Sequence, residues 1–299
     1  MRLVGCGEGV CSCMSTSREQ HDPYGWPEFY DILHTPGTLA EALALLRVAR
    51  RFVRRNDGQM KRGQREKRGG AWLECGCGTG RYGLALLKRG LSQYVGVDLH
   101  PAMTAFARGR LRQEGLVRRG RIVLGDMRTL RGVREVMPRG GFHAAFCLDN
   151  SIRHLPSDRA MVEHLRSVGR VLRPGGVYIV GIGLRPEGGD SPSEHIAFAR
   201  KRGVTVHSTA NFLPPGADVH GRAARVEKCY VYTTATTRGG VLEWSSRYEL
   251  RTWTVEQWSD AVRAGGMEEV AVVDGHARDL DAGRTAYAFR VLCAMERSR

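Results

Sequence analysis

Three alternating glycines, Gly76, Gly78 and Gly80, follow a short apolar run and are the residues most suited to binding chemistry in this chain. Glycine allows backbone conformations and a close approach of ligand that a Cβ atom would forbid. The apolar run at 71–75 predicts a strand before these glycines, and the composition of 82–89 predicts a helix after them. A strand, a glycine turn and a helix in this order are typical of a site for a nucleoside cofactor.

The spacing of this glycine loop narrows the choice of cofactor. A dinucleotide fingerprint places glycines at the first, third and sixth positions, whereas here the third glycine is at the fifth position and Arg81 follows it. NAD and FAD are therefore disfavoured. A phosphate-binding P-loop is excluded, because no Lys-Ser or Lys-Thr follows the glycines at the required place. The ligand should lack a pyrophosphate, and an ordinary glycine-rich turn is the structural alternative.

Polar side chains end the next predicted strands, at 94–98, 121–125 and 143–149. Asp98 ends the first of these, 22 positions after Gly76, where a carboxylate can accept both hydroxyls of a ribose. Asp98 could instead cap the helix predicted at 101–114. The other two strands lead to Asp126 and to the polar run that begins at Asn150. In an open α/β sheet this edge holds the ligands.

These motifs resemble those of a known family. The pattern Glu74-x-Gly-x-Gly-x-Gly80 is similar to the first motif of class I S-adenosylmethionine-dependent methyltransferases, whose glycine turn lies against the methionine part of the cofactor. The segment 148–156 resembles that of glycine and sarcosine N-methyltransferases and related small-molecule enzymes. The resemblance implies S-adenosylmethionine as the cofactor, held by Glu74, Gly76, Cys77, Gly78, Gly80, Asp98, Leu99, Met103, Asp126, Met127 and Leu148.

The same resemblance assigns roles within this set. Asp98 would bind the ribose, Asp126 would take the adenine amino group, and Met127 would pack on the adenine ring or offer its N–H. Asn150, His154 and Tyr30 are the expected catalytic residues, with the tyrosine closing over the active site. The expected acceptor-binding residues are Tyr24, Arg153 and Arg185.

Arg185 lies near the arginine that holds the acceptor carboxylate in the glycine enzymes, although it is displaced by two positions. His154 could alternatively be a helix-start residue whose ring serves only the fold. N-methylation of a small molecule is slightly favoured over O-methylation, because methyl transfer from a sulfonium needs mainly positioning and an unprotonated amine.

Composition limits the other classes of function. The 299 residues are 42% hydrophobic, and no window of about 18 apolar residues or secretory-signal layout is present, so a cytoplasmic protein without a membrane partner is expected. The eight cysteines do not form a disulfide framework. Cys6, Cys11 and Cys13 lack a nearby histidine or fourth cysteine, so no metal site is predicted.

A formal net charge of +15 keeps a nucleic-acid partner open but does not favour it. Only five of the 46 basic residues are lysines, a skew that codon bias explains more simply than a binding face. The densest basic block covers 50–68 and reads as a solvated helix end with a linker. An RNA methyltransferase and a non-catalytic cofactor-binding protein remain the alternatives, and a homo-oligomer is possible.

Short strands that alternate with helices predict a doubly wound, seven-stranded, mostly parallel α/β sheet, the Rossmann-like methyltransferase fold. A helical cap should precede this sheet, and an antiparallel hairpin around Arg238-Gly239-Gly240 should be added to it. We expect these parts to span 1–23 (a disordered extension), 24–70 (cap and basic linker), 71–184 (cofactor-binding core), 185–253 (substrate-side lid with the hairpin) and 254–299 (completion of the core sheet).

Overall fold

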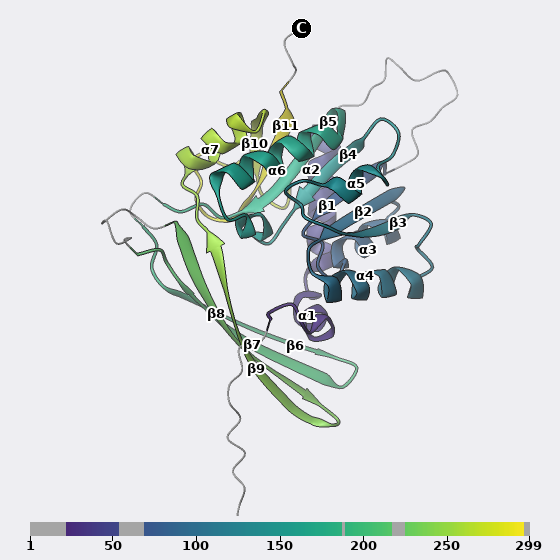
Figure 1. The fold of residues 1–299 in the computed structure, drawn as a ribbon, viewed down its shortest axis with the longest axis vertical. Helices are drawn as coiled ribbons and strands as arrows, with labels where there is room; N and C mark the ends of the chain where they lie inside the picture. The colour runs from purple at the N-terminus through teal and green to yellow at the C-terminus, as the bar shows by residue number, and fades with distance from the viewer. Residues whose placement is uncertain (1–21, 54–68, 187–188, 217–224, 296–299) are drawn as a thin grey trace, which may run out of the picture.

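The computed structural model describes residues 22–53, 69–186, 189–216 and 225–295. A seven-stranded sheet forms its centre, with the strand order β10-β11-β5-β4-β1-β2-β3 (Figure 1). Six strands run in the same direction, while β11 is antiparallel to both of its neighbours, β5 and β10. The strands are β1 (Ala71–Cys75), β2 (Gln93–Asp98), β3 (Gly120–Leu124), β4 (Phe142–Cys147), β5 (Leu172–Ile182), β10 (Met267–Val273) and β11 (Ala288–Ala294).

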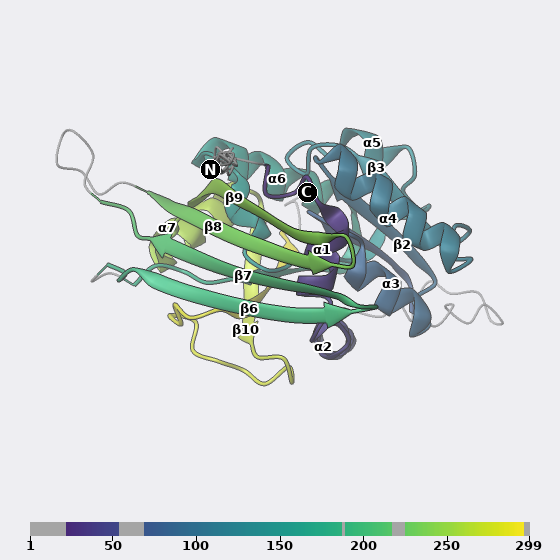
Figure 2. The ribbon, with the colours of Figure 1, turned by 90° about the horizontal axis from the view of Figure 1, so that it is seen from below.

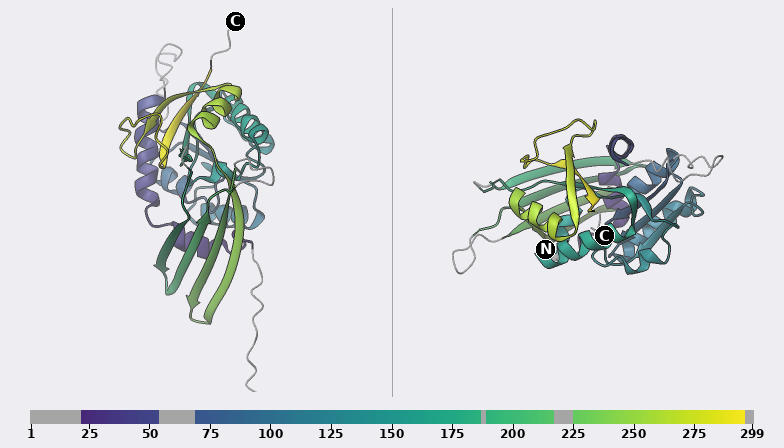
Figure 3. Two further views of the ribbon diagram at one scale, coloured as in Figure 1. Left: turned by 90° about the vertical axis from the view of Figure 1, so that its left-hand side faces the viewer. Right: turned by 90° about the horizontal axis from the view of Figure 1, so that it is seen from above.

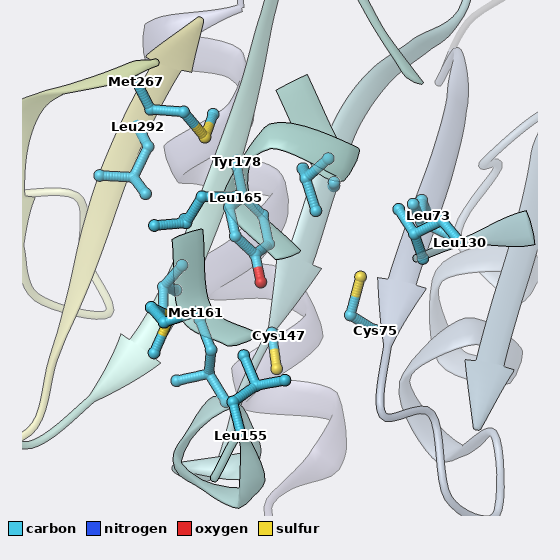
Figure 4. Packing of buried hydrophobic residues seen from close by; sticks show 14 of the residues in the cluster. Leu73, Cys75, Leu130, Cys147, Leu155, Met161, Leu165, Tyr178, Met267 and Leu292 are labelled. Carbon is cyan, nitrogen blue, oxygen red and sulfur yellow. The ribbon is translucent and has the colours of Figure 1, made fainter. Parts of the chain in front are cut away.

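Helices cover both faces of this sheet, as the alternation of strands and helices predicts. One face packs against α5 (Arg131–Arg134), α6 (Asp158–Val171) and α7 (Val255–Ala264), and Figure 4 shows Met161 and Leu165 of α6 beside Tyr178 of the sheet. The other face packs against α2 (Thr38–Phe52), α3 (Arg81–Lys88) and α4 (Pro101–Gln113). The prediction of a doubly wound, seven-stranded, mostly parallel sheet is therefore confirmed.

A second sheet of four antiparallel strands projects from the first (Figure 3). It contains β6 (Ser193–Lys201), β7 (Val204–Leu213), β8 (Val226–Thr237) and β9 (Gly240–Arg251). The hairpin of β8 and β9 was predicted within 185–253, whereas the strands β6 and β7 of the same segment were not. The strand β6 carries its large apolar side chains, Ile196 and Phe198, on the exposed face, and the small Ala199 is buried. The usual pattern of large apolar residues on the buried face is therefore absent.

The helix α1 (Pro27–His34) lies between the two sheets (Figure 2). Its Asp31 is almost completely buried and accepts hydrogen bonds from three other parts of the molecule. Thr79 of the glycine loop and Arg110 of α4 both donate to Oδ1, while the Lys201 ammonium of β6 lies 3.1 Å from Oδ2. The Asp31 carboxylate thus joins α1 to the glycine loop, to α4 and to the second sheet.

Gly83 in α3 leaves room for the ring of Tyr94, since a Cβ atom there would lie 2.0 Å from the Tyr94 ring. We predict that Gly83→Ala lowers the free energy of unfolding by about 1–3 kcal/mol through overpacking, although alanine is the better helix former. Gly109→Ala in α4, where a Cβ would meet nothing within 4 Å, should raise it by up to about 1 kcal/mol. Urea denaturation measures both, and an unchanged midpoint for Gly83→Ala would contradict the packing.

Candidate active site

Two cavities meet at the carboxyl edge of the seven-stranded sheet, where the strand order reverses between β1 and β4. The first, the cofactor cleft, has a volume of about 470 Å³ and runs from the glycine loop past the ends of β2 and β3. The second, the acceptor cavity, has a volume of about 410 Å³ and lies between α1 and the second sheet. They share four lining residues, Tyr24, Tyr30, Ser151 and His154.

The glycine loop and Asp98 form one end of the cofactor cleft. Gly76 and Gly78 both have positive φ angles (71° and 49°) and line the cleft, and a Cβ on Gly78 would point into open space. The Asp98 carboxylate accepts the Gly78 N–H at 2.7 Å with Oδ2 and the His100 N–H at 2.9 Å with Oδ1. The backbone therefore fixes this acceptor in the cleft, with lone pairs left for a ligand.

Asp126 and Met127, which follow β3, also line the cofactor cleft, as do Leu99 and Met103. Asp126 Oδ1 accepts the Arg128 N–H at 2.7 Å, which orients the carboxylate. The buried His164 donates from Nδ1 to the Met127 carbonyl at 2.8 Å, so its Nε2 accepts the Tyr178 hydroxyl. Burial lowers the pKa of His164 to about 4, so the imidazole that holds the Met127 carbonyl is uncharged at pH 7.

Four of the expected cofactor residues do not line the cleft. Glu74 is buried beneath the glycine loop, where it accepts the Tyr94 hydroxyl and where burial raises its pKa to about 8. Cys77 and Leu148 belong to the core, and a Cβ on Gly80 would meet Ala107 of α4. In the structure these residues form the floor of the site. A sequence motif cannot distinguish such a supporting residue from one that contacts the ligand.

Tyr24 and His154 form a hydrogen-bonded pair at the junction of the two cavities, with the hydroxyl 2.9 Å from Nε2. Burial, with the nearby Arg153, lowers the pKa of His154 to about 4, so the imidazole is neutral at pH 7. Burial also raises the pKa of Tyr30 to about 12, so its hydroxyl stays protonated. The junction therefore presents uncharged groups that can accept or donate hydrogen bonds.

The remaining predicted residues differ in their surroundings. Asn150 lines the acceptor cavity, but its Oδ1 already accepts the Gly183 N–H at 2.8 Å. Arg153 also lines this cavity and forms an ion pair with Glu227 at 2.8 Å. Arg185 lines neither cavity, and its N–H donates to the Trp253 carbonyl.

Sequence reasoning missed the side chains that the second sheet contributes to the acceptor cavity. Glu227 of β8 and Trp244, Ser246 and Tyr248 of β9 all line it. Alternation along β9 was the available signal, because every second residue from Trp244 to Leu250 faces inward. Without the tertiary structure, nothing indicated that this face meets the cofactor cleft.

Other predictions fall on parts of the chain that the structure leaves undescribed. Cys6, Cys11 and Cys13 lie outside the described residues, as does the basic block after Val53. Within the described ranges, no group of three or more His, Cys, Asp or Glu residues could hold a metal ion. No helix in those ranges is long and apolar enough to cross a membrane.

Comparison with known proteins agrees with the methyltransferase resemblance of the sequence motifs. Residues 73–176 match the family model of a methyltransferase domain. An uncharacterized methyltransferase of Emericella nidulans is 32% identical over 117 residues, which are 36% of this chain and 40% of that relative. The chain thus aligns with less than half the length of this curated relative.

Solved structures of similar fold cover much more of the chain. DesVI of Streptomyces venezuelae superposes with a TM-score of 0.67 at 19% identity, covering 92% of this chain and all of that one. The sugar N-methyltransferase KedS8 of a Streptoalloteichus species gives 0.62 at 21% identity, covering 99% and 100%. The amino pentose methyltransferase CalS10 of Micromonospora echinaspora, solved with S-adenosylmethionine bound, gives 0.58 at 24% identity, covering 85% and 89%.

The matched segment contains the end of β1, the strands β2 to β4, the glycine loop and both aspartates of the cofactor cleft. The similarity in fold extends through the second sheet, because the alignments with DesVI and KedS8 cover more than nine-tenths of the chain. Residues 73–176 are therefore similar to a methyltransferase domain, and the chain has the fold of these solved methyltransferases.

Proposed function

We propose that this protein transfers the methyl group of S-adenosylmethionine to an amine of a small-molecule acceptor. The observation that carries the proposal is the meeting of the two cavities at Tyr24, Tyr30, Ser151 and His154. A methyl donor in the cofactor cleft and an acceptor in the second cavity would face each other there. Holding two reactants in this way supplies much of the rate enhancement of a bimolecular transfer.

The residues present fit the cofactor. The volume of the cleft is in the range of small-molecule sites, and its two ends carry acceptors for the hydroxyl and amino groups of a nucleoside. Asp98 would hold the ribose, Asp126 the adenine amino group, and Gly78 would lie against the methionine part. When bound, the cofactor supplies a methyl group on a sulfonium sulfur, so a carbon–nitrogen bond forms as the carbon–sulfur bond breaks.

The electrostatics of the junction favour nitrogen over oxygen as the acceptor atom. A hydroxyl acceptor needs a base, but a His154 with a pKa of about 4 is a weak one, and Tyr30 stays protonated. An amine that arrives unprotonated needs only orientation. The oxygens of Tyr24 and Tyr30 can accept its N–H groups and turn its lone pair toward the methyl position. The named activities of KedS8 and CalS10, on a sugar amine and an amino pentose, support an amino sugar as the acceptor.

Asp98→Ala should weaken binding of S-adenosylhomocysteine by about 100-fold or more, because it removes charge-assisted hydrogen bonds to the ribose. Micromolar affinity is expected for the unaltered protein, measured by titration calorimetry. Asp260→Ala on the exposed face of α7, where the carboxylate pairs with Arg263, is the matched control and should bind normally. Undiminished binding by Asp98→Ala would rule out the cofactor assignment.

His154→Phe should lower kcat about tenfold to 100-fold without changing the affinity for S-adenosylhomocysteine, because the imidazole positions the Tyr24 hydroxyl. Initial rates are measured from pH 6 to 9 with the amino sugar that turns over fastest in a screen. His154 is neutral above its folded pKa of about 4, so kcat/KM should rise with pH only as the acceptor amine loses its proton. If the profile of kcat/KM against pH showed a transition near pH 6.5 that disappeared in His154→Phe, His154 would not be neutral as proposed.

A further inference from the structure

The acceptor cavity is elongated along β9. Trp244, Ser246 and Tyr248 face into it from the same side of this strand, because alternate residues share a face. The Tyr248 ring lies 5.7 Å from that of His154 between centroids, so this end is beside the methyl-transfer junction. Trp244 is four residues away, which is roughly 13 Å at the rise of a strand. An occupant that reaches both ends is longer than one sugar ring or an amino acid.

Three aromatic side chains form the far end of this cavity. The rings of Trp26, Phe29 and Trp244, which we call the aromatic shelf, lie 5.7–6.1 Å apart between centroids and are mutually tilted by 32–36°. Phe29 is buried, whereas Trp26 is 38% exposed and is not part of the small core cluster beneath. The shelf thus offers an apolar aromatic surface beside the exposed Trp26, and the face of an individual ring in it suits a stacked ring of a ligand.

The charges of the acceptor cavity disfavour a phosphate group. Among the described lining residues, Asp149, Glu227 and Arg153 carry formal charges, which sum to a net negative charge. The Arg153 guanidinium is committed to the Glu227 carboxylate and the Arg251 carbonyl. His34 and His154 both have pKa values lowered to about 4 by burial, so neither is a cation at pH 7. A diphosphate would find no available guanidinium or ammonium among these residues.

We propose that the acceptor is a phosphate-free amino sugar joined to a second, flat ring, with the amine at the His154 end and the ring on the aromatic shelf. In this arrangement Trp26 and Trp244 determine specificity rather than chemistry. The enzyme would therefore act after the sugar has been joined to its ring-bearing partner by a glycosyl transfer. This inference rests on the proposed methyltransferase function and deepens it.

Glucosamine, p-nitrophenyl glucosaminide and UDP-glucosamine share one amino sugar. Their affinities distinguish the effect of an attached flat ring from that of an attached diphosphate. Each is titrated calorimetrically into the full-length protein saturated with S-adenosylhomocysteine. The p-nitrophenyl compound should bind about tenfold or more tightly than glucosamine, because its ring stacks on the shelf. UDP-glucosamine should bind more weakly than the p-nitrophenyl compound.

Trp244→Ala and Trp26→Ala should each reduce the advantage of the p-nitrophenyl compound by about threefold or more. Both should leave the affinity for glucosamine and for S-adenosylhomocysteine unchanged. Trp244 also packs against the buried Phe29 cluster, so Trp26→Ala keeps the test valid if Trp244→Ala fails to fold. Tyr230→Ala, which removes an exposed aromatic ring of β8 that does not line the acceptor cavity, is the matched control and should behave as the unaltered protein.

Equal affinity for glucosamine and its p-nitrophenyl compound would overturn the inference, as would an advantage that survives both tryptophan variants. Tighter binding of UDP-glucosamine than of the p-nitrophenyl compound would overturn the exclusion of phosphate. Binding of none of the three to the S-adenosylhomocysteine complex would show that the cavity does not take such an acceptor. Failure of S-adenosylhomocysteine itself to bind would instead refute the proposed function, so the two failures are distinguishable.

Discussion

The buried carboxylate of Asp31 is the contact on which the arrangement of the two cavities depends. It joins α1 to the glycine loop through Thr79, to α4 through Arg110, and to the second sheet through Lys201. A buried carboxylate is stable only when its lone pairs are satisfied, so these groups must come together whenever α1 docks. The helix that closes the acceptor cavity is thereby linked to the loop that forms the cofactor cleft.

Burial also sets the chemistry of the junction. Where the cavities meet, Tyr30 is half-buried and His154 keeps part of its surface exposed. Partial desolvation there disfavours the charged forms and keeps the imidazole of His154 and the hydroxyl of Tyr30 neutral at pH 7. In the proposed reaction, neutral groups would hold an amine without protonating it, whereas a cationic histidine would repel a positively charged acceptor and donor alike. Positioning by hydrogen bonds therefore suits methyl transfer from a sulfonium better than acid–base catalysis does.

The sequence predicted the parts of the site that depend on local structure and missed the parts that depend on packing between distant segments. The glycine loop, Asp98 and Asp126 were predictable because each directly follows a strand, and parallel strands bring their ends to one edge. Cys77 and Leu148 were placed in the same motifs, yet their side chains point into the core. The strands β6 and β7 were not predicted, and in β6 the large Ile196 and Phe198 lie on the exposed face while the small Ala199 is buried.

By itself, the sequence determined the order of the strands of the seven-stranded sheet, the glycine loop and the carboxylates that follow the parallel strands. These features are local, because turn chemistry and the periodicity of apolar residues act over a few positions. Only the tertiary structure decided which residues face the acceptor. Glu227, Trp244 and Tyr248 enter the site because a second sheet folds against α1. Alternation along β9 indicates which of its residues share a face, but no short segment indicates that this face meets the cofactor cleft.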